Sequence, residues 1–257
     1  MGWRQQRPLQ KLFKKAKEEE ASDLIIIQDH LYFLKSLPIE EIQIGSLRFS
    51  MENLEELLLE ISHFPFLKKL KIHSCGLTSL PSQLSSLINL RHLSLNFNKF
   101  SCLPEVIYSF IQLETLSVVG NNIEELSPQL GELFVLKALL FSGNQIEKIP
   151  EEIGKLVNLE RLDLNKNKVR VLPSVISQCV RLKQVILNFN LLESLPEEIG
   201  DLSNLEQLLL RDNKIKVLPS SIKFLNNLSW LDLTDNPVAN ISEEIQKLGS
   251  IERLWLG

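Results

Sequence analysis

The chain has 257 residues and a formal net charge of −4, from 28 basic and 32 acidic side chains, and hydrophobic residues make up 44% of it. This near balance excludes a dominant electrostatic attraction to nucleic acid or to an anionic membrane, so we expect no nucleic-acid partner. No apolar run reaches the roughly 18–20 residues that a membrane-spanning helix needs. Leucine accounts for 52 residues, a bias that indicates a repeat architecture.

Residues 1–22 predict a basic amphipathic helix. Its apolar residues recur at helical spacing, as in Leu9, Leu12, Phe13 and Ala16. Two interpretations stay open: the helix lies on a membrane surface or on a partner, or it caps the open end of a repeat stack. We favour the cap. The N-terminus shows no apolar segment of a secretory signal and the three cysteines form no cluster, so we expect a cytoplasmic protein.

Residues 23–66 predict irregular repeats, which begin with a strand over residues 23–27. Two registers compete after residue 39. A frame of 23 residues conflicts with the expected asparagine and proline, whereas a frame of 28 residues leaves a longer helix over residues 52–64 with apolar side chains at helical spacing. We favour the longer frame. The strand would contain Leu47 and Phe49 in the first frame, and Ile42 and Ile44 in the second.

From residue 67 to residue 257 a period of 23 residues is held without a slip, and the last repeat stops partway. Eight successive repeats fit the pattern L-x-x-L-x-L-x-x-N-x-φ-x-x-φ-P-x-x-φ-x-x-φ-x-x, where φ is apolar. The alternation in L-x-L predicts a short strand with its leucines facing the interior. Because no repeat can bury its apolar side alone, the strands must stack in parallel. The prolines predict the first turn of short helices on the convex side.

The ninth position of the repeat is asparagine in seven successive repeats. A buried asparagine offers two donors and an acceptor to turning backbone that would otherwise lack partners. We therefore predict a structural ladder rather than a reactive site. Its members are Asn98, Asn121, Asn144, Asn167, Asn190, Asn213 and Asn236, and Cys75 holds the same position in the first repeat.

The pattern resembles the leucine-rich repeat family. Its L-P-x-x-I-x-x-L half, as at Leu172, Pro173, Ile176 and Cys179, is similar to the intracellular Ras-suppressor-like and Ras-group-related proteins. The resemblance implies an α/β leucine-rich repeat solenoid: a curved right-handed arc with parallel strands, about ten of them, on the concave face and short helices and turns on the convex face. It also implies a role in signalling, as a scaffold for partner proteins.

Catalysis finds no support in the sequence. It contains no glycine-rich phosphate loop and no metalloprotease or hydrolase motif. His73 and His92 fall on neighbouring strands, but at positions too far apart along the strand to share a metal. Cys75 and Cys179 occupy core positions. We therefore predict no enzyme activity, no cofactor and no metal site.

The concave face is the predicted binding surface, because strand positions three, five, seven and eight point away from the core and line up across the repeats. Large aromatic side chains beside arginine and carboxylates are typical of protein-binding surfaces. Trp230 and Arg253 share a column on adjacent strands, which predicts a cation–π contact. Arg161, Asp163 and Lys166 form a charged belt across this face. The predicted protein-binding residues are Ile186, Phe189, Leu209, Arg211, Trp230, Asp232, Arg253 and Trp255, with a smaller group of Phe97, Val119 and Leu140.

The function predicted from these observations is a non-enzymatic scaffold that binds a protein partner on the concave face. The alternative is a recognition segment of a larger enzyme or effector whose catalytic part lies outside this chain. Trp255 keeps three interpretations: it contacts a partner, further repeats, or a second copy through the uncapped C-terminal end.

Overall fold

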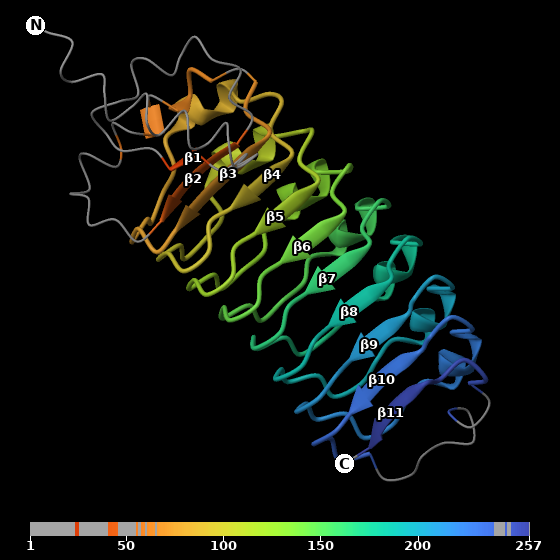
Figure 1. The fold of residues 1–257 in the computed structure, drawn as a ribbon. Coiled ribbons are helices and arrows are strands. Elements are labelled where there is room, and N and C mark those ends of the chain that lie inside the picture. Colours follow the sequence, from red (N-terminus) through yellow and green to blue (C-terminus); the bar gives the residue numbers. More distant parts are fainter. Residues whose placement is uncertain are drawn as a thin grey trace, which may run out of the picture.

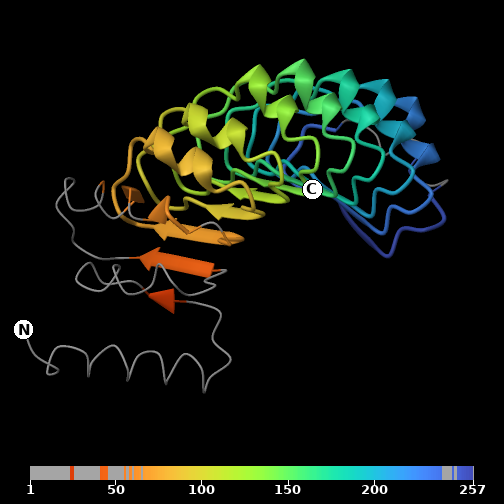
Figure 2. The same cartoon turned by 90° about the horizontal axis from the view of Figure 1, so that it is seen from above.

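The structure is a computed structural model that describes residues 24–25, 41–45, 55, 58–59, 61–64, 66–238, 245 and 248–256. These residues form one parallel sheet of eleven strands, ordered β1 to β11 as in the sequence (Figure 1). Figure 2 shows the strands along the inner side of an arc and the short helices along its outer side. The predicted solenoid is therefore confirmed, with one strand more than the ten that we expected.

The strands are short because each repeat contributes only the segment between two turns. Most of them contain three residues, and the central side chain of each three-residue strand is buried. Their bounds are β1 (Leu24–Ile25), β2 (Glu41–Gly45), β3 (Lys69–His73), β4 (His92–Ser94), β5 (Thr115–Ser117), β6 (Ala138–Leu140), β7 (Arg161–Asp163), β8 (Gln184–Ile186), β9 (Gln207–Leu209), β10 (Trp230–Leu233) and β11 (Arg253–Leu256).

The convex side carries a row of five-residue 3-10 helices. They are η2 (Ser82–Ser86), η3 (Glu105–Ser109), η4 (Pro128–Glu132), η5 (Glu151–Lys155), η6 (Ser174–Gln178), η7 (Glu197–Asp201) and η8 (Ser220–Phe224). We expected each proline within the first turn, but only Pro128 lies there, with Ser127 as its cap. The other prolines sit one residue earlier, as at Pro104, whose carbonyl accepts the first helical bond from the Ile107 N–H at 3.0 Å.

The N-terminal strands follow the 28-residue frame. In β2, Ile42 pairs with Leu70 of β3 and Ile44 pairs with Ile72, whereas the 23-residue frame would place Leu47 and Phe49 in a strand. Strand β1 lies within the predicted segment and pairs with β2. Among the described residues of the following segment, Leu58 and Ile61 are helical and buried. The predicted capping helix over residues 1–22 lies outside the described residues.

One hydrophobic core runs along the whole stack, from Leu58 to Leu248. The leucines of each L-x-L segment face inward; in β7 and the residue after it, Leu162 and Leu164 are completely buried. Because each repeat covers the apolar side of its neighbour, the core has no boundary between repeats.

The ladder asparagines bond the backbone of neighbouring repeats to one another. Asn144 shows the pattern: its Oδ1 accepts from the Ile123 N–H at 3.0 Å, and its Nδ2 donates to the carbonyls of Val118 and Phe141 at 2.8 and 2.9 Å. Six of the seven asparagines are buried, and Asn236 is half-buried. Each amide therefore supplies partners to turning backbone from which water is excluded.

Candidate protein-binding face

The parallel register arranges the concave side chains in columns. In the column of fifth positions, Leu209 lies between Ile186 and Asp232, and Trp255 follows Asp232. In the column of third positions, Trp230 lies beside Arg253. Strands β8 to β11 thus bring five of the predicted residues together with Trp255 at the end of the sheet.

Two tryptophans and an arginine form the centre of this region. The ring centroids of Trp230 and Trp255 are 5.2 Å apart, with an angle of 57° between the rings. The guanidinium carbon of Arg253 lies 5.2 Å from the Trp230 ring centroid, which confirms the expected cation–π contact. Trp230 Nε1 is buried and has no hydrogen-bond acceptor among the described residues, so packing rather than hydrogen bonding holds this indole. We call Leu209, Trp230, Asp232, Arg253 and Trp255 the tryptophan group.

Phe189 and Arg211 belong to a second group, at the carboxyl ends of the strands. Phe189 is exposed, and the cationic ends of Lys166 and Arg211 lie 5.7 and 5.8 Å from its ring centroid. Arg211 also forms a salt bridge of 3.1 Å with Asp235. We call Lys166, Phe189, Arg211 and Asp235 the phenylalanine group. The sequence analysis placed Phe189 and Arg211 in one cluster with the two tryptophans, whereas the structure divides this cluster between two heights along the strands.

In the smaller apolar group, the Phe97 N–H donates to the Val119 carbonyl at 2.7 Å, and the N–H of Val118, next to Val119, donates to the Leu140 carbonyl at 2.8 Å. Leu140 lies between Ser117 and Asp163 in its column. Phe97 lies beyond the end of β4, exposed, with its ring over the backbone of Gly120: a Cβ added to Gly120 would stand 2.6 Å from that ring. Of the predicted charged belt, Arg161 and Asp163 form a salt bridge of 3.3 Å, whereas the Lys166 ammonium lies 5.7 Å from the Phe189 ring centroid.

The eighth position of the repeat has a backbone conformation that the sequence analysis missed. Its φ angle is between +52° and +70° in eight successive repeats, in the left-handed region that bulky residues rarely adopt. Gly120 and Gly143 at this position were the available signal. Phe97 and Phe189 therefore present their rings from a backbone that the neighbouring repeat holds, since the Phe189 N–H donates to the Arg211 carbonyl at 2.7 Å. The residues are Ser74, Phe97, Gly120, Gly143, Lys166, Phe189, Asp212 and Asp235.

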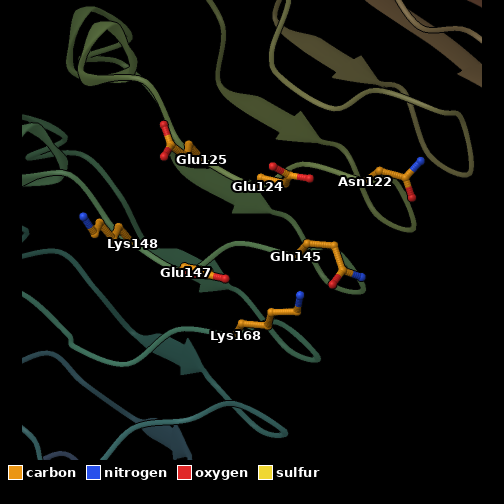
Figure 3. Close-up of a pocket in the computed structure, with 7 residues that line it drawn as sticks. All are labelled: Asn122, Glu124, Glu125, Gln145, Glu147, Lys148 and Lys168. Atoms are coloured by element: carbon orange, nitrogen blue, oxygen red, sulfur yellow. The ribbon is translucent and has the colours of Figure 1, made fainter.

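A polar depression of about 710 Å³ lies on the flank of the solenoid that follows the ladder asparagines. Figure 3 shows its lining side chains, which come from the loops after β5, β6 and β7. Three carboxylates and two lysines mix there, so the charges largely cancel. The lining residues are Asn122, Glu124, Glu125, Gln145, Glu147, Lys148 and Lys168.

The histidines and cysteines are dispersed. His92 pairs with Lys69 in the register, four residues before His73 along β3, and the described residues contain no group of histidine, cysteine and carboxylate side chains that could hold a metal. Burial and then the charge of Lys71 lower the pKa of His73, whose Nε2 lies 2.7 Å from the Ser94 hydroxyl. Burial raises the pKa of the Cys179 thiol to about 12. These groups do not form a reactive centre.

Comparisons with known proteins agree with this architecture. Two models of the leucine rich repeat match residues 180–238 and 89–110. A leucine-rich-repeat protein of Leptospira interrogans is similar, with 31% sequence identity and a TM-score of 0.77, over 86% of this chain and 60% of that one. An internalin of Listeria monocytogenes has the same fold, with 19% identity and a TM-score of 0.71, over 86% of this chain and 68% of that one.

The third similar structure is the leucine-rich-repeat ectodomain of the Arabidopsis thaliana membrane receptor kinase GASSHO1/SCHENGEN3, in complex with CASPARIAN STRIP INTEGRITY FACTOR 2. It shares 27% identity with this chain, with a TM-score of 0.75, over 90% of this chain and 28% of the ectodomain. This chain thus spans less than two thirds of both the Leptospira protein and the plant ectodomain. None of the helices among the described residues has the length and apolar composition needed to cross a membrane.

Proposed function

Because the chain is built of leucine-rich repeats, a family that these matches support, we propose that it is a non-enzymatic interaction scaffold that holds a protein partner on its concave face. The tryptophan group carries this proposal. Its rings and its guanidinium are gathered on one surface, where Trp255 keeps 41% of its surface exposed. Tryptophan and arginine supply much of the binding free energy at protein interfaces, because they combine large apolar area with hydrogen-bonding groups.

The phenylalanine group extends this surface toward the carboxyl ends of the strands. Phe189 offers an exposed ring with two cations beside it, and Asp235 adds negative charge through its salt bridge to Arg211. A partner with apolar side chains and both signs of charge fits this arrangement. The similar plant ectodomain, which was solved with a bound factor, supports a binding role for such a solenoid.

A signalling role in the cytoplasm is part of the same proposal. Its support is the resemblance to the intracellular class, together with three cysteines that are all free thiols. Fluorescence microscopy of the tagged chain in its native cells tests the location, and a signal outside the cytoplasm would contradict it.

The decisive experiment compares variants in affinity capture from the lysate of the native organism, followed by mass spectrometry. The double variant Leu209→Glu, Trp230→Ala should lose a protein that the wild type retains. The control is Val217→Glu, because Val217 is 71% exposed but lies outside the concave columns. Circular dichroism first establishes that both variants fold. A partner that the double variant retains as well as the control would remove the concave face from the proposal.

The alternative, a recognition segment of a larger enzyme or effector, is favoured by one observation at the last strand. Leu254 of β11 is 37% exposed, whereas Leu231, at the same repeat position in β10, is fully buried. Further repeats or another domain would cover it. The reading frame beyond residue 257 tests this alternative, since a stop codon there would leave no room for such a domain.

A further inference from the structure

An exposed row of apolar side chains runs along the edge of the solenoid where the chain enters the strands. The row holds position 22 in five successive repeats, and its members are Ile88, Ile111, Phe134, Val157 and Val180. Between 46% and 64% of each residue is exposed. Monomeric proteins rarely leave such a contiguous apolar strip uncovered.

The fold itself does not require apolar residues in this row. The core is filled from the preceding position, where Leu133 and Leu156 are fully buried. Two later repeats have Ser203 and Asn226 at position 22 and keep the same turn. The five apolar residues therefore serve some purpose other than the packing of a single chain.

Two of the turns that carry the row, those of Phe134 and Val180, are held in place by side-chain hydrogen bonds from the next repeat. Asn158 Nδ2 donates to the Phe134 carbonyl at 2.9 Å, and Asn204 Nδ2 donates to the Val180 carbonyl at 2.8 Å. The row is thus a rigid surface, which loses little conformational entropy when it is covered.

A row of charges of alternating sign lies beside the apolar row, three residues further along the chain in each repeat. Glu114 bonds both Arg91 and Lys137, at 3.0 and 2.7 Å, and Glu160 bonds Lys183 at 2.9 Å. Backbone bonds of 2.8–2.9 Å link successive members, so the spacing of the charges is fixed. In order, the row is Arg91, Glu114, Lys137, Glu160, Lys183 and Glu206.

We propose that this edge is a homodimer interface, in which a second copy of the chain packs its apolar row antiparallel against the first. The two-fold axis lies in the interface and crosses the row between Phe134 and Val157. Each charge then faces an opposite charge of the second copy: Lys137 faces Glu160, Glu114 faces Lys183, and Arg91 faces Glu206. In the apolar row, Phe134 faces Val157 and Ile111 faces Val180.

The two rows together select this register over its neighbours. The proposed axis sets one apolar residue, Ile88, against the polar Ser203. An axis one repeat further on, between Val157 and Val180, still sets opposite charges against each other but places both Phe134 and Ile111 against polar residues, Ser203 and Asn226. An axis that passes through Val157 sets Lys137 against Lys183 of the second copy, and like charges face each other. Charge patterns of this kind act mainly by penalising the wrong arrangements.

Sedimentation velocity of the 257-residue chain over a range of concentrations tests the proposal. The wild type should form a dimer, and Phe134→Glu should raise its dissociation constant at least about tenfold, because a carboxylate meets the apolar row of the second copy twice per dimer. Val217→Glu, on the opposite flank, is the matched control and should leave the dimer intact. A wild type that stays monomeric, or a dimer that Phe134→Glu does not weaken, overturns the proposal.

Exchange of charges tests the register. Lys137→Glu and Glu160→Lys should each weaken self-association, because like charges then face each other across the axis. An equimolar mixture of the two variants should associate more tightly than either alone, since opposite charges face each other again in the mixed dimer. A mixture no tighter than its components refutes the register.

This interface does not depend on the concave binding surface, and the two fail separately. The double variant Leu209→Glu, Trp230→Ala should still dimerise, and Phe134→Glu should still capture the concave partner. A dimer that Leu254→Glu disrupts and Phe134→Glu leaves intact would instead place the contact at the end strand β11, and would overturn the proposal.

Discussion

Replacing two neighbouring ladder asparagines by alanine should destabilise the protein by more than the sum of the two single replacements. Asn144 and Asn167 both donate to the carbonyl of Phe141, at 2.9 and 3.0 Å. After either single replacement the carbonyl keeps one of these two donors. After both it keeps neither, while it stays within the buried core.

The magnitude follows from the groups that lose their partners. Each single variant leaves one buried N–H without its acceptor: that of Ile123 for Asn144→Ala and that of Ile146 for Asn167→Ala, each bonded at 3.0 Å. An unpaired buried group costs about 1–3 kcal/mol, so each variant should lose that much free energy of unfolding. The Phe141 carbonyl adds roughly another 1–3 kcal/mol in the double variant, as a coupling free energy.

The control is the pair Asn144 and Asn190, which share no acceptor, because Asn190 donates to Leu164 and Leu187. Their effects should add within about 0.5 kcal/mol. Urea unfolding followed by circular dichroism measures all five variants against the wild type, and amide hydrogen exchange should show the Ile123 N–H exchanging faster in Asn144→Ala. Equal additivity in the two pairs would refute the shared-carbonyl reasoning.

Three further predictions concern single residues. Lys166 has a φ of +53°, so Lys166→Gly should raise the free energy of unfolding by about 1 kcal/mol. Lys168 lies outside the left-handed region, so Lys168→Gly should lower the free energy of unfolding by roughly 0.5–1 kcal/mol. Urea unfolding that shows the same sign for both variants would contradict the backbone assignment. The pKa of His73 is lowered from 6.5 in the folded protein, so protonation of this side chain favours unfolding. The part of the free energy of unfolding that depends on neutral His73 is fully present above pH 6.5, and it is lost as the pH falls through the lowered folded value. Unfolding measured from about pH 7 to 5 should therefore show a slope that His73→Gln reduces, and an unchanged slope would assign it to other groups. A thiol reagent at neutral pH should modify exposed Cys102 and spare buried Cys179, because burial raises the pKa of the Cys179 thiol to about 12. Peptide mass spectrometry measures the labelling of each cysteine. Equal labelling of the two would mean that the core opens next to η6.

Much of the architecture could be predicted from the period of 23 residues. Because every repeat has the same neighbours, the residue pattern that buries Leu162 and Leu164 in one repeat must do so in all of them. The same reasoning extended to the less regular start of the chain, where the helical spacing of Leu58 and Ile61 favoured the frame that β2 follows. Local periodicity is sufficient there, since it reflects contacts between adjacent repeats.

The surface could not be predicted in this way, because it depends on where each side chain leaves the backbone. The repeat pattern shows that Phe189 and Trp230 lie outside the core. It does not show that the eighth position has a left-handed backbone, which directs the Phe189 side chain away from the tryptophans. The repeat pattern places Leu156 at an apolar position and Val157 at a variable one, but it does not show that Val157 belongs to an exposed apolar row. The exposure of position 22 in the stacked repeats shows that row. Repeat periodicity thus determines the core, while the geometry of each turn determines which apolar residues remain exposed for a partner.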